Sequence, residues 1–193
     1  MTHPSTHSGQ ADKVTFGFWV YLMSDCVLFA GLFATYAVLS GATFGAPGIG
    51  DIVSLPYVAG ETLLLLTSSF TIGLALLAAQ ANKKRLVLVA LAATLALGLG
   101  FLAMEVYEFA HLIGAGHGPD KSAFLSAFFT LLGTHGLHVA LGLVWMLVVM
   151  AHVYMRGLAA GTRTKLMCLG LFWHFLDIIW IFIFTFVYLF GSL

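Results

Sequence analysis

The chain has 193 residues, of which 61% are hydrophobic and only 8% are charged. A water-soluble domain usually has about a quarter of its residues charged and about half of them apolar. This composition therefore excludes a single soluble core and predicts an integral membrane protein. The formal net charge is zero, which gives no indication of a nucleic-acid partner. Cys26 and Cys168 both fall in apolar stretches, which argues against a disulfide framework or a closed zinc site.

Five apolar stretches follow a polar segment over residues 1–15, which is expected to form a disordered tail. Each stretch reaches the roughly 20 residues that a helix needs to cross the hydrocarbon core. All the prolines lie outside the stretches, with Pro56 at or just before the start of one. The sequence thus predicts an all-α integral membrane protein, with a bundle of five transmembrane helices within residues 16–193. The helices are expected at about 16–39, 57–80, 86–111, 122–154 and 166–189.

The basic residues are distributed unevenly between the two sides of the predicted bundle. Lys121 lies alone on one side. By the positive-inside rule, the side with more Lys and Arg faces the cytoplasm, so the N-terminus is expected in the cytoplasm and the C-terminus in the periplasm. The residues on the richer side are Lys13, Lys83, Lys84, Arg85, Arg156, Arg163 and Lys165.

Three ionisable residues are predicted at similar depth in the membrane. Asp25, His135 and Asp177 lie about 14, 20 and 18 Å into their helices at 1.5 Å per residue. In a core about 30 Å thick, these depths fall in the middle third. His174 lies three residues before Asp177 and shares its helix face. Because a lipid-facing charge is costly, the first, fourth and fifth helices are expected to share an interior surface that holds these residues.

Further polar residues lie nearer the outer face. Glu61 is one turn into the second helix, and Glu105, Glu108 and His111 follow one another at i, i+3 and i+6 in the third. We expect an intramembrane polar network that serves structure or gives lipid or oxygen access. Its candidate members are Asp25, Glu61, Glu105, Glu108, His111, His135, His138, His174 and Asp177.

Two metal-binding interpretations compete with a purely structural one. Glu108-x-x-His111 matches half of the motif that builds di-iron sites in helical bundles, but the second half is not found in this sequence. His135 or His138 could pair with His174 as axial ligands of a haem, as in a small haem-binding membrane anchor of a dehydrogenase. The structural alternative is a set of buried histidines that form interhelical hydrogen bonds.

Proton transfer is a third interpretation. Asp25 and Glu61 are intramembrane carboxyls, which often mark proton pathways, so a carboxylate-based proton transporter is an alternative to packing through hydrogen-bonded neutral carboxyls. The sequence has no nucleophile–base pair and no phosphate-binding loop. We therefore expect no catalytic site and no metal site in this chain alone.

Four motifs in order resemble subunit III of bacterial cytochrome o-type ubiquinol oxidases, within the haem-copper oxidase subunit III family. Phe16–Asp25 is similar to the first helix of that family and Met104–Phe109 to the third. Gly133–Val139, with its His-Gly-Leu-His, looks like the fourth, and Trp173–Asp177 like the fifth. Cytochrome c oxidase subunits III share the last two motifs. The seven-helix members of that group have two more N-terminal helices, so the five-helix pattern favours the quinol-oxidase branch.

The resemblance implies a non-catalytic subunit of a proton-pumping terminal oxidase that transfers electrons from ubiquinol to oxygen. It implies that haem and copper lie in the partner subunit I, that no cofactor lies in this subunit, and that the complex lies in the bacterial inner membrane. The implied partners are subunit I, the other oxidase subunits and phospholipids, with ubiquinol bound in a partner subunit.

The resemblance also suggests roles for two residues. Asp25 occupies the place of a family carboxylate, usually glutamate, that is discussed for oxygen or lipid access. Arg156 matches a family arginine that meets lipid phosphate in the larger members. An arginine at the membrane interface can bind phosphate through charge-assisted hydrogen bonds, although it can equally be a charge that only sets topology.

Overall fold

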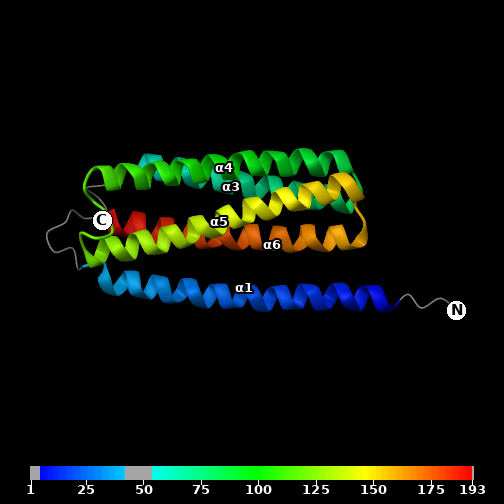
Figure 1. The fold of residues 1–193 in the computed structure, drawn as a ribbon, viewed down its shortest axis with the longest axis horizontal. Helices are drawn as coiled ribbons and strands as arrows, with labels where there is room; N and C mark the ends of the chain where they lie inside the picture. The colour runs from blue at the N-terminus through cyan, green and yellow to red at the C-terminus, as the bar shows by residue number, and fades with distance from the viewer. Residues whose placement is uncertain (1–4, 42–53, 193) are drawn as a thin grey trace.

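The computed structural model describes residues 5–41 and 54–192, and the side chains of residues 13–41 and 54–191. Throughout this part of the chain the regular structure is helical (Figure 1). The last long helix continues into a π-helical segment, η1 (Phe184–Leu189), and a short 3₁₀ turn, η2 (Phe190–Ser192). The long helices are α1 (Ser5–Leu39), α3 (Leu55–Gln80), α4 (Lys84–Gly114), α5 (Ala123–Arg156) and α6 (Ala160–Ile183).

Five helices in the described ranges are long and apolar enough to cross a membrane, which confirms the predicted all-α fold class. The bounds differ from the prediction mainly at the N-terminus. Helix α1 begins at Ser5 rather than at Phe16, so residues 5–15 are helical instead of forming part of a disordered tail. Extending an existing helix is easier than starting one, so polar residues can continue α1 beyond its apolar segment.

Local signals explain several helix ends. Pro56 lies in the first turn of α3, where its missing N–H is not needed. The hydroxyl of Ser122 accepts a hydrogen bond from the backbone N–H of Leu125 at 3.1 Å and caps α5. Helix α5 ends at Arg156 and is followed by Gly157, whose φ of 68° suits glycine. The turn between α3 and α4 contains Asn82 at φ 59°, a conformation that asparagine tolerates better than most residues.

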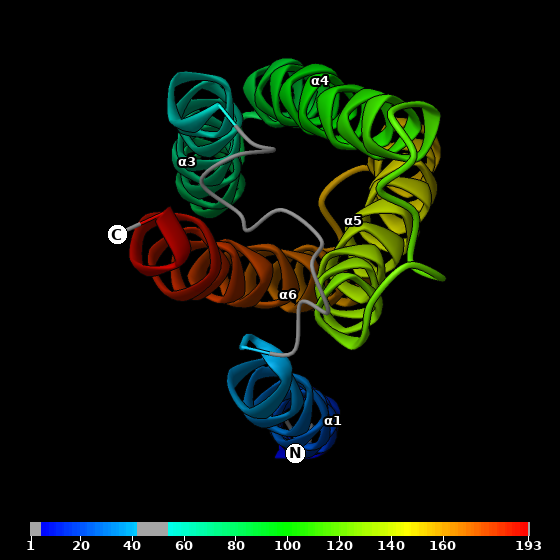
Figure 2. The ribbon, with the colours of Figure 1, turned by 90° about the vertical axis from the view of Figure 1, so that its left-hand side faces the viewer.

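The helices α3, α4, α5 and α6 surround a common core, and α1 lies outside this group against α5 and α6 (Figure 2). Large buried side chains fill the core, including Trp173, Trp180, Phe101 and Phe128. In α1, by contrast, Phe29 is fully buried while most neighbouring apolar side chains are exposed. Because α1 has only one protein-facing side, much of its surface is left for lipid or another subunit.

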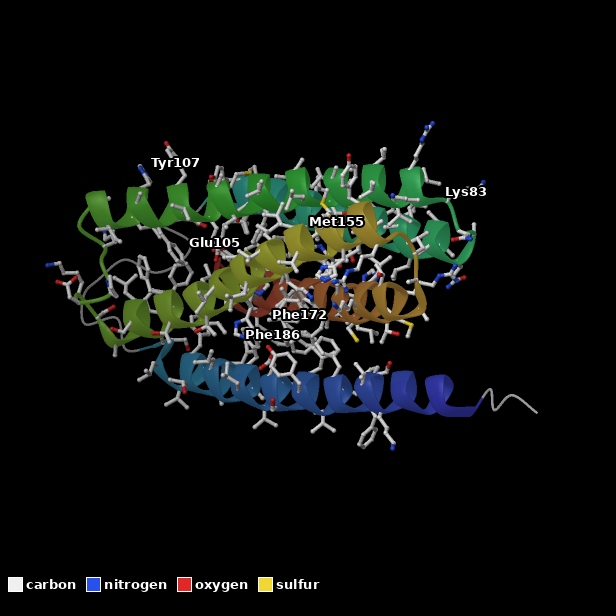
Figure 3. All side chains as sticks on the ribbon, turned by 45° about the vertical axis from the view of Figure 1, so that its right-hand side comes forward. Lys83, Glu105, Tyr107, Met155, Phe172 and Phe186 are labelled. Atoms are coloured by element: carbon white, nitrogen blue, oxygen red, sulfur yellow. The ribbon has the colours of Figure 1, made fainter. Side chains whose placement is uncertain are left out.

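Both basic turns lie at the same end of the bundle as the start of α1 (Figure 1). These turns join α3 to α4 and α5 to α6, and Lys83 marks this end in Figure 3. The C-terminal segment and the turn between α4 and α5 lie at the opposite end. This arrangement places the basic residues predicted for one side close to one another.

Candidate functional site: polar contacts inside the bundle

A carboxyl and an imidazole face each other where α1 meets α5. The Nε2 atom of His138 lies 3.8 Å from Oδ2 of Asp25. On the other side of the ring, Nδ1 donates a hydrogen bond to the carbonyl oxygen of Thr134 at 2.7 Å. Because Nδ1 carries its hydrogen, Nε2 carries one only if the ring is protonated. At 3.8 Å the two atoms are too far apart for a hydrogen bond, and Oδ2 of Asp25 has no hydrogen-bond partner among the described residues.

His135 occupies a different, wholly apolar environment. Its ring is fully buried and lies among Trp180, Phe101 and Phe29, with centroid distances of 5.3, 6.0 and 6.4 Å. Neither ring nitrogen has a hydrogen-bond partner among the described residues. His138, the other candidate haem ligand on α5, also contacts Phe29, with ring centroids 5.3 Å apart, but it faces the carboxyl of Asp25 as well.

Three side-chain hydrogen bonds join α3 to α6. The hydroxyl of Ser69 lies 2.7 Å from Nδ1 of His174. One residue earlier on each helix, the indole N–H of Trp173 donates to the hydroxyl of Ser68 at 2.9 Å. Closer to the C-terminal end of α6, the indole N–H of Trp180 donates to the hydroxyl of Thr62 at 3.0 Å. These hydrogen bonds connect the middle part of α3, from Thr62 to Ser69, to the second half of α6.

Asp177 belongs to this α3–α6 contact rather than to the surface shared with α1. Its carboxyl interacts electrostatically with Ser69 and His174, and its Oδ1 atom has no hydrogen-bond partner among the described residues. The expected interior surface common to the first, fourth and fifth helices is therefore divided. Asp25 meets α5, while His174 and Asp177 face α3.

Three glutamates lie together inside the bundle, at the end where η1 lies. Glu61 on α3 interacts electrostatically with Glu105 and Glu108 on α4, and their exposed fractions are 0%, 2% and 7%. The hydroxyl of Tyr188 in η1 donates a hydrogen bond to Oε2 of Glu108 at 3.2 Å. Both carboxyl oxygens of Glu61 and of Glu105 have no protein partner in the described ranges. Three carboxyls so close together and away from water cannot all carry a charge.

The carboxyl of Glu105, labelled in Figure 3, lies against α5 beside Gly136. A Cβ atom built on Gly136 would lie 2.6 Å from Oε2 of Glu105 and 2.8 Å from Oε1. The missing side chain of Gly136 thus creates the space that the carboxyl occupies. Gly133, one turn earlier, would meet its nearest neighbour, Phe109, only at 3.8 Å.

Two other residues that the sequence analysis singled out, His111 and Arg156, lie apart from these contacts. His111 is exposed, and its ring stacks on that of Tyr107 at 6.3 Å with an interplanar angle of 9°. Six residues of helix at 3.6 residues per turn leave His111 about 120° around α4 from Glu105. Arg156, the predicted lipid-phosphate residue, lies exposed in the last turn of α5.

The hydrogen-bond partners of the predicted polar residues were not themselves predicted from the sequence. The side chains of Thr62, Ser68, Ser69 and Tyr188 each hydrogen-bond to a predicted residue or to a tryptophan of α6. The available signal was the presence of hydroxyl side chains in an otherwise apolar helix, because such groups often hydrogen-bond between membrane helices. Tyr188 has no comparable signal, since its position depends on the π-helical segment that follows α6.

The fold and these contacts define a multi-pass membrane protein whose buried polar groups join helices to one another. The family model described as "Cytochrome c oxidase subunit III" matches residues 3–192. The chain therefore belongs to the cytochrome c oxidase subunit III family.

Individual relatives cover nearly the whole chain. A Pseudomonas aeruginosa protein named cytochrome bo(3) ubiquinol oxidase subunit 3 is 56% identical over 99% of this chain and 91% of its own length. A Buchnera aphidicola protein of the same name is 44% identical over 100% of this chain and 94% of its own length. A Staphylococcus epidermidis protein named probable quinol oxidase subunit 3 is 41% identical, with coverages of 96% and 92%.

Proposed function

We propose that this chain is a non-catalytic subunit of a proton-pumping ubiquinol oxidase in the bacterial inner membrane. The observation that carries the proposal is its 56% identity, over almost its full length, to a relative named as subunit 3 of a bo(3) ubiquinol oxidase. The relative from Staphylococcus, named as a probable quinol oxidase subunit, agrees with the same electron donor. In this proposal ubiquinol, haem and copper bind in partner subunits, with haem and copper in subunit I.

The contacts of the histidines support a role in packing rather than in holding a redox group. His174 bonds to Ser69 on α3, whereas His138 faces Asp25 on α1. Because these rings point to different helix interfaces, they do not converge as a pair of ligands on one iron. His135 lies among aromatic side chains. The chain would instead stabilise subunit I and its bound phospholipids.

The proposed orientation has the basic end of the bundle in the cytoplasm and the C-terminus in the periplasm. The grouping of Lys83, Lys84 and Arg85 with Arg163 and Lys165 at one end supports it, because basic turns are retained on the cytoplasmic side. In this orientation the glutamate cluster lies nearer the periplasm. Labelling of single cysteines placed at Lys83 and at Lys121 with an impermeant thiol reagent tests it, since only the second is expected to react in intact cells.

Affinity purification tests the proposed function directly. A tag on this chain is expected to isolate, in mild detergent, a complex that contains haem and oxidises ubiquinol with oxygen. Isolation of the tagged chain with a complex that accepts electrons only from cytochrome c would contradict the quinol assignment. Isolation without any haem-containing partner would contradict the proposal as a whole.

A further inference from the structure

The basic end of the bundle carries more positive charge than the protein neutralises. Lys83, Lys84, Arg85, Arg163 and Lys165 all lie at the two turns of this end. The part of the chain that the structure describes contains two ion pairs, Lys121–Asp120 and His138–Asp25, and neither lies at this end. An anion from outside the chain would therefore meet uncompensated charge here.

The guanidinium group of Arg163 is held in place by two hydrogen bonds. Its Nε donates a hydrogen bond to the carbonyl oxygen of Leu158 at 3.0 Å. One of its terminal nitrogens, Nη2, donates to Oδ1 of Asn82 at 3.2 Å. A guanidinium has five N–H groups, so several remain available. The two fixed bonds reduce the conformational entropy that Arg163 would lose on binding a ligand.

A pocket of about 330 Å³ opens between α3 and α6 beside this guanidinium. Its apolar walls include Leu76, Leu166 and Met167, and its polar end includes Gln80, Arg163 and Thr164. These residues belong to the last turns of α3 and the first turns of α6, where the spans meet the membrane surface. The pocket therefore has an apolar part in the membrane and a cationic part at the boundary with water.

The position of Arg163 in α6 adds to the preference for an anion. Helix α6 begins at Ala160, its first turn has no acidic residue, and its N-cap residue forms no capping hydrogen bond through a side chain. The N-terminal end of a helix carries a partial positive charge. A cation placed there is unfavourable unless an anion lies nearby, and a phosphate can meet both the guanidinium and the helix end.

We propose that this pocket, the Arg163 pocket, binds one anionic phospholipid. The phosphate would lie on Arg163, and one acyl chain would lie along Leu76 and Met167. The proposal rests on the membrane location in the proposed function and deepens its phospholipid binding, because it assigns a site at the α3–α6 face. This site is separate from Arg156, which lies at the end of α5.

Native mass spectrometry of the purified complex tests the proposal. The complex is delipidated and titrated with phosphatidylglycerol, phosphatidylcholine or inorganic phosphate. The variants are Arg163→Gln, which removes the charge, and Met167→Trp, which fills the pocket. Arg85→Gln is the control, because Arg85 is an exposed cation at the same end that does not line the pocket.

The wild-type complex is expected to bind one more phosphatidylglycerol than the Arg163→Gln and Met167→Trp complexes, with affinity lowered about tenfold or more in both. The Arg85→Gln complex should match the wild type. Equal binding in all four complexes, equal retention of phosphatidylcholine, or displacement of the lipid by inorganic phosphate would overturn the proposal. The Arg163→Lys complex, which keeps the charge but loses the planar guanidinium group, should bind phosphatidylglycerol with intermediate affinity. This variant tests the proposal even if Met167→Trp fails to fold.

Failure of this proposal is distinguishable from failure of the proposed function. If the tagged chain is isolated without haem-containing subunits, the proposed function is wrong. The same lipid titration on the tagged chain in nanodiscs then still decides whether the Arg163 pocket binds an anionic lipid.

Discussion

The hydroxyl of Ser69 on α3 lies 2.7 Å from Nδ1 of His174 on α6, and this contact connects a residue of the Trp-His-Phe-x-Asp motif to a helix outside the motif. Asp177, three residues further along α6, lies near the same hydroxyl. His174 and Asp177, two polar residues of the motif, thus share one contact with α3.

Ser69→Ala is expected to destabilise the protein by about 0.6 kcal/mol and by no more than ~1.7 kcal/mol, the range measured for hydrogen bonds between membrane helices. The change leaves a nitrogen of His174 without its partner. A double-mutant cycle with His174→Phe, monitored by unfolding in denaturing detergent, measures the coupling. Additive effects of the two changes would show that the contact contributes nothing.

Asp177→Ala should weaken incorporation of this chain into the oxidase, because it removes a buried polar partner of the Ser69–His174 pair. Blue-native electrophoresis of membranes reports the fraction of oxidase that contains this chain. Asp177→Asn keeps the size of the side chain and is expected to weaken incorporation less. An unchanged subunit content in Asp177→Ala would contradict the prediction.

Gly136→Ala should destabilise the protein by about 1 kcal/mol, the low end of the usual cost of overpacking, because the group that must shift is the end of the flexible Glu105 side chain. The new methyl group would lie 2.6 Å from Oε2 of Glu105, so the carboxyl must move. Gly133→Ala is the matched control on the same helix, because its methyl group would lie 3.8 Å from the nearest side-chain atom. Thermal denaturation of the purified complex compares the two, and equal losses would argue against the contact.

Phe29→Ala is expected to loosen α1 from the bundle, with a loss of about 3–5 kcal/mol for a large buried side chain. Phe29 is fully buried and packs against His138 at a ring distance of 5.3 Å. Val27→Ala serves as the control, since Val27 is 74% exposed. Limited proteolysis in detergent measures the release of α1. Equal protection in both variants would contradict the prediction.

The glutamate cluster makes a spectroscopic prediction. Because three neighbouring buried carboxyls cannot all be ionised, infrared spectra at neutral pH should contain C=O bands of protonated carboxyls. Glu105→Gln is expected both to remove a band and to shift those of Glu61 and Glu108. Asp25→Asn, remote from the cluster, should leave these bands unchanged. Bands that disappear singly, without shifts in the others, would show that the three carboxyls do not interact.

The sequence predicted the helices well because length and hydropathy alone decide which segments can cross a membrane. It could not place residues 5–15, since helix propagation into a polar segment leaves no apolar signal. The predicted polar residues were largely found inside the bundle, but their pairing was not predictable. The position of a residue along a helix does not tell which neighbouring helix its side chain faces. The sequence therefore could not show that His174 contacts α3 rather than α1.

The position of Tyr188 shows the same limit more clearly. It lies in the π-helical segment after α6, where the backbone departs from the 3.6-residue period on which face assignments depend. Its hydroxyl reaches Glu108, 80 residues earlier in the chain. His111 illustrates the opposite case, because ordinary helical geometry, applied over six residues, already rotates it away from Glu105.

The haem and copper contents of the oxidase, purified from cells with and without this chain, test the central claim most directly. We expect equal amounts of haem and copper per subunit I in both preparations, with the same initial rate of ubiquinol oxidation and a shorter active lifetime when the chain is absent. A stoichiometric loss of haem or copper without the chain, restored when it is supplied and also found bound to the chain alone, would contradict the account.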